Sequence, residues 1–130
     1  MIEIATTGNQ EGVLQKDIAK NQNISLKYLD PIIASLKLKR LIVNSKGKGS
    51  GYVLAKTAEQ ISMLDIYTAF ERIEVVECIN NLEFCARSTH DCKANNYWME
   101  FSKDFISLLS KKTLKDIIEK TKYECQDCTL

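Results

Sequence analysis

The chain has 130 residues, of which 45% are hydrophobic and 27% are charged, and its net charge at neutral pH is +1. This composition is typical of one globular domain and excludes disordered and collagen-like chains. No run approaches the roughly 18 consecutive apolar residues of a membrane-spanning helix, and the N-terminus lacks the basic and apolar regions of a secretory signal. We therefore expect a cytoplasmic protein without a membrane partner.

The charge is distributed unevenly along the chain. Residues 13–56 hold nine Lys or Arg against two Asp, a net charge of +7, whereas residues 57–130 hold nine basic and thirteen acidic residues, a net charge of −4. A basic first half joined to an acidic second half is typical of a polyanion-binding module attached to a part that does not touch the polyanion. A solvated lysine-rich face explains the charge alone equally well.

The basic half begins with two predicted short helices. Apolar spacing predicts the first over residues 13–22, a polar turn follows over 21–23, and Ser25 can cap the second helix. The apolar face of the second helix has the spacing i, i+3, i+4, i+7 and consists of Leu29, Ile32, Ile33 and Leu36. Pro31 stands one turn inside this helix and predicts either a bend or a restart there, with Asp30 as the new cap.

A glycine-tipped hairpin is predicted to follow. Residues 41–46 and 52–54 read as strands, and the turn over 47–51 holds three glycines and Lys48. Two short helices followed by such a hairpin form a winged helix-turn-helix.

The acidic half is predicted to be helical around a cysteine-bearing segment. Ser62 and Asp65 form a capping box that opens a helix. That helix is expected to bury Met63, Ile66, Tyr67 and Phe70. The longest helix is predicted from Asn96 to about Lys112, and Thr113 caps a final short helix. One stripe of the long helix is expected to form a dimer interface through Trp98, Phe101, Phe105 and Leu108, although packing onto its own domain is the alternative for each residue.

The predicted fold class is therefore mainly α with a small β-hairpin: a winged helix-turn-helix domain plus a long C-terminal dimerisation helix. We divide the chain into a DNA-binding domain over 1–72, a cysteine-bearing loop over 73–94, the dimerisation helix and a short C-terminal helix over 95–122, and a tail over 123–130.

Five cysteines, an odd number, argue against a disulfide framework. Cys78, Cys85 and Cys92 are spaced seven residues apart, and three converging thiolates suit an iron–sulfur cluster. Zinc, which more often uses C-x2-C pairs, and free thiols remain the alternatives. His90 is a tentative further ligand. Cys125 and Cys128 form a C-x2-C pair near the C-terminus whose role stays open.

These motifs together resemble the Rrf-two family of winged-helix regulators, whose members include IscR and NsrR. The residues that carry the resemblance are Asp17-Ile18-Ala19, Ile24-Ser25, Tyr28-Leu29, Gly51-Tyr52-Val53-Leu54-Ala55, Ile61 to Ile66, Phe70-Glu71, the three spaced cysteines and Trp98. The resemblance implies a homodimeric bacterial transcription factor whose long helix pairs with its twin. It also implies, for cluster-binding members, a 2Fe–2S or 4Fe–4S cluster held by three cysteines and a variable fourth ligand.

Three features depart from the family pattern. Only Met1 to Ala5 can form the last turn of the family's first helix, which predicts a weakened domain. The wing reads Gly49-Ser50-Gly51 where the family usually has paired glycines, and Pro31 replaces a more usual polar residue.

In a helix-turn-helix, the N-terminal residues of the second helix face the bases of the major groove. Here these residues are Ser25, Lys27 and Tyr28, and Tyr28 has a core position as its alternative. Lys46 and Lys48 on the wing are predicted to contact phosphates or the minor groove. Two such domains on a two-fold axis require a palindromic operator in double-stranded DNA.

The function predicted from the sequence is a homodimeric DNA-binding transcriptional regulator. It is expected to sense redox state, nitric oxide or iron–sulfur status through a Cys-ligated iron–sulfur cluster. Two alternatives are a cluster-free regulator of cysteine metabolism, controlled by a partner protein or metabolite, and a winged-helix protein-interaction module. An enzyme is the weakest interpretation, because the chain has one His and no phosphate-binding glycine loop.

Overall fold

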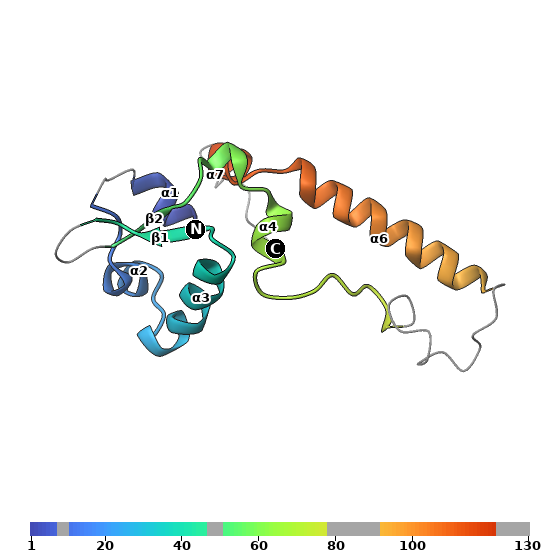
Figure 1. Ribbon diagram of the computed structural model, residues 1–130, viewed down its shortest axis with the longest axis horizontal. Coiled ribbons are helices and arrows are strands. Elements are labelled where there is room, and N and C mark those ends of the chain that lie inside the picture. The colour runs from blue at the N-terminus through green and yellow to red at the C-terminus, as the bar shows by residue number, and fades with distance from the viewer. Residues whose placement is uncertain (8–10, 47–50, 78–91, 122–130) are drawn as a thin grey trace, which may run out of the picture.

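The computed structural model describes residues 1–7, 11–46, 51–77 and 92–121 (Figure 1). The described part is mainly helical and contains one two-stranded antiparallel sheet, which confirms the predicted fold class. Its elements are α1 (Ile2–Thr7), α2 (Gln15–Asn21), α3 (Leu26–Leu38), β1 (Ile42–Asn44), β2 (Tyr52–Leu54), the 3-10 turn η1 (Ala58–Gln60), α4 (Met63–Tyr67), α6 (Lys93–Lys111) and α7 (Leu114–Thr121).

The molecule is elongated, with its two halves at opposite ends (Figure 1). Helices α1, α2 and α3 and the hairpin lie together at one end. Helix α6 runs from the far end back toward them, and α7 and α4 lie between. Within the described ranges every helix is too short or too polar to cross a bilayer.

Within the described residues, the core lies in residues 1–61, which we call the first lobe, and in the start of α7. Ile42, Ile61 and Leu114 are the most deeply buried large side chains. The other buried hydrophobic residues are Ile4, Val13, Ile18, Ala19, Leu29, Ile33, Leu36 and Leu41. Helix α6 contributes no fully buried residue, so the first lobe is stabilised without it.

Helix α3 is continuous across Pro31, so the predicted restart at that residue is wrong. Ser25 caps the helix, since its side chain accepts a hydrogen bond from the Tyr28 backbone N–H at 3.1 Å. The carboxylate of Asp30 accepts a hydrogen bond from Gln15 of α2 instead of capping a new helix. Burial of the apolar face of α3 against the core keeps the helix intact, although Pro31 supplies no amide donor to the preceding turn.

Each helix of the helix-turn-helix is followed, two residues after its end, by a residue in the left-handed conformation. Asn23 has φ 52° after α2, and Arg40 has φ 54° after α3. In each case the next amide reaches back five residues, Ile24 N–H to Ala19 O and Leu41 N–H to Leu36 O, both at 3.0 Å. These are Schellman ends, which fix the turn between the two helices and the entry into β1.

The hairpin is extended at its base by a segment that the sequence did not identify as a strand. In the hairpin itself, Val43 pairs with Val53. Val13 forms an additional antiparallel bridge with Tyr52 through two backbone hydrogen bonds of 3.0 and 2.8 Å. Gly12, with φ +75°, and Gly51 lie back to back, and a Cβ atom on Gly51 would lie 2.5 Å from the backbone of Gly12 and Val13.

Helix α4 differs from its prediction. Its capping box between Ser62 and Asp65 is present, with both reciprocal hydrogen bonds formed. The helix ends at Tyr67, however, and none of its residues is fully buried. Phe70 lies beyond the helix end and is 47% exposed. The expected burial of this face is wrong for Tyr67 and Phe70 and only partial for Met63 and Ile66. Ile66 packs against the core, whereas the remainder of α4 packs against the solvent-exposed α6.

The starts of α4 and α7 are joined side by side. Ser62 and Thr113 form an antiparallel bridge, in which Met63 N–H donates to Lys112 O at 2.7 Å and Leu114 N–H donates to Ile61 O at 2.8 Å. Thr113 also caps α7 as predicted, since its side chain accepts a hydrogen bond from the Asp116 amide. This joint connects α6 to the first lobe.

Candidate nucleic-acid interface

The N-terminus of α3 presents its side chains to solvent. Tyr28 is 63% exposed, which excludes the core position considered for it, and Lys27 is exposed beside it. Leu26, the first residue of the helix, is 50% exposed. Ser25 uses its oxygen as the cap acceptor, and its hydroxyl proton stays available as a donor. A helix end with exposed polar, basic and apolar side chains can form the hydrogen bonds and apolar contacts by which proteins recognise base edges.

A hydrogen-bonded chain of side chains holds the wing, α2 and α3 together. The Tyr52 hydroxyl of β2 donates to Gln15 Oε1 at 3.1 Å. The amide of the same Gln15 donates to Asp30 Oδ1 on α3. The position of the wing is therefore fixed relative to α3 by polar contacts as well as by the core.

The wing itself is only partly described. Lys46, at its near side, is exposed. Lys48 lies outside the described residues. Lys37 near the end of α3 lies over the ring of Tyr52, with Nζ 5.8 Å from the ring centroid, in a cation–π arrangement.

The basic residues of the first lobe are not neutralised within the described part of the chain. Its two ion pairs are both made by Lys115, with Glu59 at 3.0 Å and with Glu119 at 3.9 Å. The basic residues of the first lobe that form no ion pair there are Lys16, Lys20, Lys27, Lys37, Lys39, Arg40, Lys46 and Lys56. Unpaired positive charges on one lobe attract a polyanion.

The aromatic stripe of α6 divides into an inward and an outward part. Phe105 packs edge-on against Tyr67 of α4, with ring centroids 6.2 Å apart, and Trp98 is half-buried. Phe101 is 44% exposed and Leu108 is 60% exposed. Tyr97, which the sequence prediction omitted, is 60% exposed and lies on the same side as Leu108, eleven residues or three helical turns away.

Of the predicted metal ligands, only Cys92 is among the described residues. It is half-exposed, forms no disulfide and stands at the N-cap of the 19-residue α6. Cys78, Cys85, His90, Cys125 and Cys128 lie outside the described residues, and the described part alone contains no cluster of three potential metal ligands.

Comparison with known proteins decides the family of this chain. The family model named Rrf2, described as an iron-dependent transcriptional regulator, matches residues 1–120. The chain belongs to the Rrf2 family. This is the Rrf-two family that the sequence motifs resemble, and it is a family of transcriptional regulators and not of enzymes.

Two curated Rrf2 relatives match along most of their length. Protein rrf2 of Nitratidesulfovibrio vulgaris is 35% identical over 119 residues, which make up 91% of this chain and 79% of that protein. The transcriptional regulator IscR of Yersinia pestis is 29% identical over 119 residues, or 91% of this chain and 71% of that protein.

Solved Rrf2-type structures share the fold. CymR of B. subtilis, named the global cysteine regulator, has a TM-score of 0.71 at 24% identity and covers 92% of this chain and 87% of its own. CymR of Staphylococcus aureus has a TM-score of 0.66 at 28% identity, with coverages of 91% and 88%. The match confirms the winged-helix architecture.

Three residues that contribute to these surfaces are not predicted from the sequence: Leu26 and Gln15 near the start of α3, and Tyr97 on α6. Leu26 was overlooked because a leucine at a helix start usually faces the core. Gln15 was overlooked because its partners are 15 and 37 residues away in the chain. Tyr97 was overlooked because Trp98 next to it dominated the helical pattern, although a 100° step per residue places Tyr97 and Leu108 on one side.

Proposed function

We propose that this Rrf2-family chain acts in the cytoplasm as a homodimeric transcriptional regulator that binds a palindromic operator in double-stranded DNA. The observation that carries this proposal is the exposed N-terminus of α3 on a lobe whose basic residues pair with no described acid. Such a surface supplies both the electrostatic attraction to phosphates and the side chains that contact base edges.

The roles of the individual residues follow from their chemistry. Lys27 donates hydrogen bonds to a phosphate or to guanine O6 and N7, and the Ser25 hydroxyl donates to a nearby acceptor. Tyr28 contacts base or sugar with its exposed ring. Lys46 and Lys48 follow the phosphates beside the groove. The chain from Tyr52 through Gln15 to Asp30 keeps wing and α3 in one register on the duplex.

The second subunit is proposed to pack on the exposed side of α6. Tyr97, Phe101 and Leu108 expose large apolar surface there, and monomeric proteins rarely leave such a face uncovered. Two of the predicted dimer contacts, Phe105 and Trp98, are partly buried against their own chain. We therefore expect them to pack beneath the interface and not to contact the second subunit directly. Two α3 helices related by the two-fold axis then read two half-sites.

The cysteines are proposed to hold an iron–sulfur cluster. Cys92 fits a ligand position, because it is a free, half-exposed thiol at a helix N-terminus. Cys78 and Cys85 supply two further thiolates, with His90 as a tentative fourth ligand. The donor set suits an iron–sulfur centre, whose chemistry makes a bound cluster responsive to redox state and nitric oxide. The family description as iron-dependent, and the similarity to IscR, support this assignment.

Anaerobic purification followed by an absorption spectrum and assays for iron and acid-labile sulfide tests the cluster. We expect visible absorbance with matching iron and sulfide, and loss of both in Cys92→Ala. Cys125→Ala, a change at a cysteine outside the proposed ligand set, is the matched control and should retain the colour. Colourless, iron-free protein after reconstitution would overturn the cluster proposal while leaving DNA binding intact.

A second candidate is a cluster-free regulator of cysteine metabolism. The similarity to S. aureus CymR, at 28% identity, favours it. The same measurement separates the two candidates, because the second predicts no iron and sulfide in a chain that still shifts operator DNA.

A further inference from the structure

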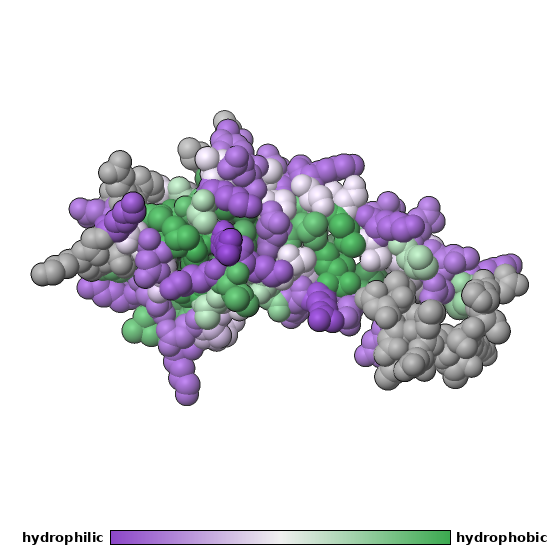
Figure 2. Space-filling view, viewed as in Figure 1, coloured by the Kyte–Doolittle hydropathy of each residue, from purple (hydrophilic) through white to green (hydrophobic). Residues whose placement is uncertain are grey.

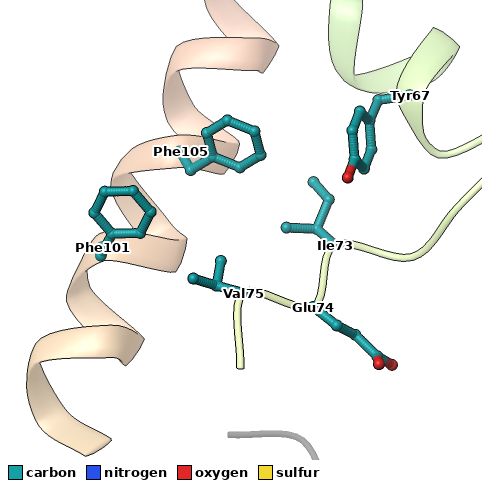
Figure 3. Close-up of a pocket in the computed structure, with 6 residues that line it drawn as sticks. All are labelled: Tyr67, Ile73, Glu74, Val75, Phe101 and Phe105. Atoms are coloured by element: carbon teal, nitrogen blue, oxygen red, sulfur yellow. The ribbon is translucent and has the colours of Figure 1, made fainter. Parts of the chain in front are cut away.

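One exposed apolar surface of the molecule lies between α4 and α6. Figure 2 shows hydrophobic residues gathered there, and they line a pocket whose apolar side chains converge in Figure 3. The lining residues are Tyr67, Ile73, Glu74, Val75, Phe101 and Phe105. Because this pocket shares Phe101 with the proposed dimer side of α6, it adds no separate site.

Another exposed apolar surface lies on the outward side of α3. The buried residues Leu29, Ile33 and Leu36 define the side of this helix that faces the core. A helix turns by about 100° per residue, so positions 27, 31, 34 and 38 form the opposite side. All four residues there are exposed: Lys27, Pro31, Ala34 and Leu38. We call Pro31, Ala34 and Leu38 the apolar stripe of α3.

The apolar stripe offers a partner contact surface without hydrogen-bonding groups. Its polar neighbours on the helix are occupied or partly covered. The carboxylate of Asp30 accepts a hydrogen bond from Gln15, Lys37 lies over an aromatic ring of β2, and Ser35 is half-buried. Beyond its first turn, α3 therefore presents mainly apolar groups on its outward side.

The surroundings of the apolar stripe are basic. Lys27 precedes it, and Lys37, Lys39 and Arg40 lie around its C-terminal end. None of the four forms an ion pair with a described residue. An apolar stripe bordered by cations is complementary to the major groove of DNA, which exposes the methyl groups of thymine between two rows of phosphates.

We propose that the apolar stripe of α3 recognises thymine, with Pro31 and Ala34 packed against the C5-methyl groups of A·T pairs. This inference rests on the proposed binding to double-stranded DNA and adds the class of operator that is preferred. Ala34 lies two helical turns beyond Lys27, about 10 Å along the helix, which corresponds to about three base pairs. We therefore expect thymines within about three base pairs of the group that Lys27 contacts.

Replacement of thymine by uracil in a selected duplex tests the proposal. The full chain first selects a duplex from a random-sequence library, and fluorescence anisotropy then gives its affinity with deoxyuridine at the thymine positions. Uracil keeps the O4 acceptor and the base pair and lacks only the methyl group. We expect the affinity to fall about fourfold for each methyl group that α3 covers.

Unchanged affinity after complete replacement, or a selected duplex without thymine in its half-sites, would overturn the thymine proposal and leave DNA binding intact. A chain that binds no duplex would overturn the proposed function as well. Both results come from the parent chain, so they do not depend on how a variant folds.

Matched variants locate the contact on α3. Ala34→Gln places a polar side chain on the apolar stripe and should bring the ratio of the affinities for the thymine and uracil duplexes toward one. Ala94→Gln, the same change at an exposed position of α6, should leave that ratio unchanged. If Ala34→Gln weakens both duplexes by the same factor, α3 does not contact the methyl groups and the proposal is wrong.

Discussion

Gly51 illustrates how a single position controls the geometry of the wing. Its α-carbon lies so close to the Gly12–Val13 backbone that no side chain fits between them. The close approach allows Gly51 N–H to donate to Glu11 O at 3.2 Å and aligns Tyr52 with Val13. The glycines of this region were predicted from the sequence as turn residues, whereas Gly51 serves as a packing position in the described structure.

Gly51→Ala should destabilise the fold by about 1–3 kcal/mol, because backbone must move to accommodate the added methyl group. Denaturant unfolding measures this change in the free energy of unfolding. An unchanged midpoint would mean that the 11–13 segment does not pair with β2 in solution.

Arg40→Gly should have the opposite effect on stability. Arg40 holds φ 54°, a conformation that is unfavourable by about 1–2 kcal/mol for residues with a Cβ atom. Glycine relieves this strain but increases the freedom of the unfolded chain, so we expect a net gain of about 0.5–1 kcal/mol. Thermal unfolding tests it, with Lys39→Gly, one residue earlier at φ −81°, as the destabilised control.

For the helices, short sequence patterns predicted where each helix starts but not which surface each helix packs against. Ser25 and the Ser62–Asp65 capping box act as predicted, because a cap depends on residues three positions apart. The packing partner of α4 could not be predicted, because the sequence does not show whether an apolar face meets the core or another surface helix. The same limit applies to α6, where Phe105 turned inward and Leu108 outward.

Leu114→Ala on α7 and Leu108→Ala on α6 compare the loss of a core side chain with the loss of an exposed one. Leu114 is 2% exposed and anchors α7 in the core, so its truncation should lower the free energy of unfolding by about 2–5 kcal/mol. Leu108→Ala should change that free energy by less than about 0.5 kcal/mol in dilute protein, yet weaken self-association in sedimentation velocity. A dimer unaffected by Leu108→Ala would contradict the proposed dimer surface.

The joint at α7 should loosen in acid. Hydrogen bonds from the Thr113 backbone amide and hydroxyl lower the pKa of Asp116 below its ordinary value, and the hydrogen bond from Lys115 likewise lowers the pKa of Glu59. A lowered carboxyl pKa stabilises the fold above the ordinary value of about 4 and loses this contribution as the pH falls below it. Thermal unfolding between pH 5 and about 3 should show a smaller loss of stability in Asp116→Asn than in the parent chain. Equal losses would contradict the contribution of Asp116.

For the whole molecule, the sequence predicted the architecture because family motifs and periodicity agreed over most of the chain, and the Rrf2 match confirms it. The charge asymmetry also located the basic lobe correctly. The polar chain from Tyr52 to Asp30 and the pocket between α4 and α6 could not be predicted, because each depends on residues brought together by tertiary packing.

The most direct test of the central claim is the salt dependence of binding to a labelled DNA duplex of mixed sequence, measured by fluorescence anisotropy. Lys27→Gln should weaken binding and reduce the slope of log K against log salt by about 1, the value for one lost phosphate contact. Lys103→Gln, the same charge change at an exposed position on α6, should leave both unchanged. If the chain binds no duplex at low salt, or if the two variants behave alike, the first lobe does not bind DNA through α3.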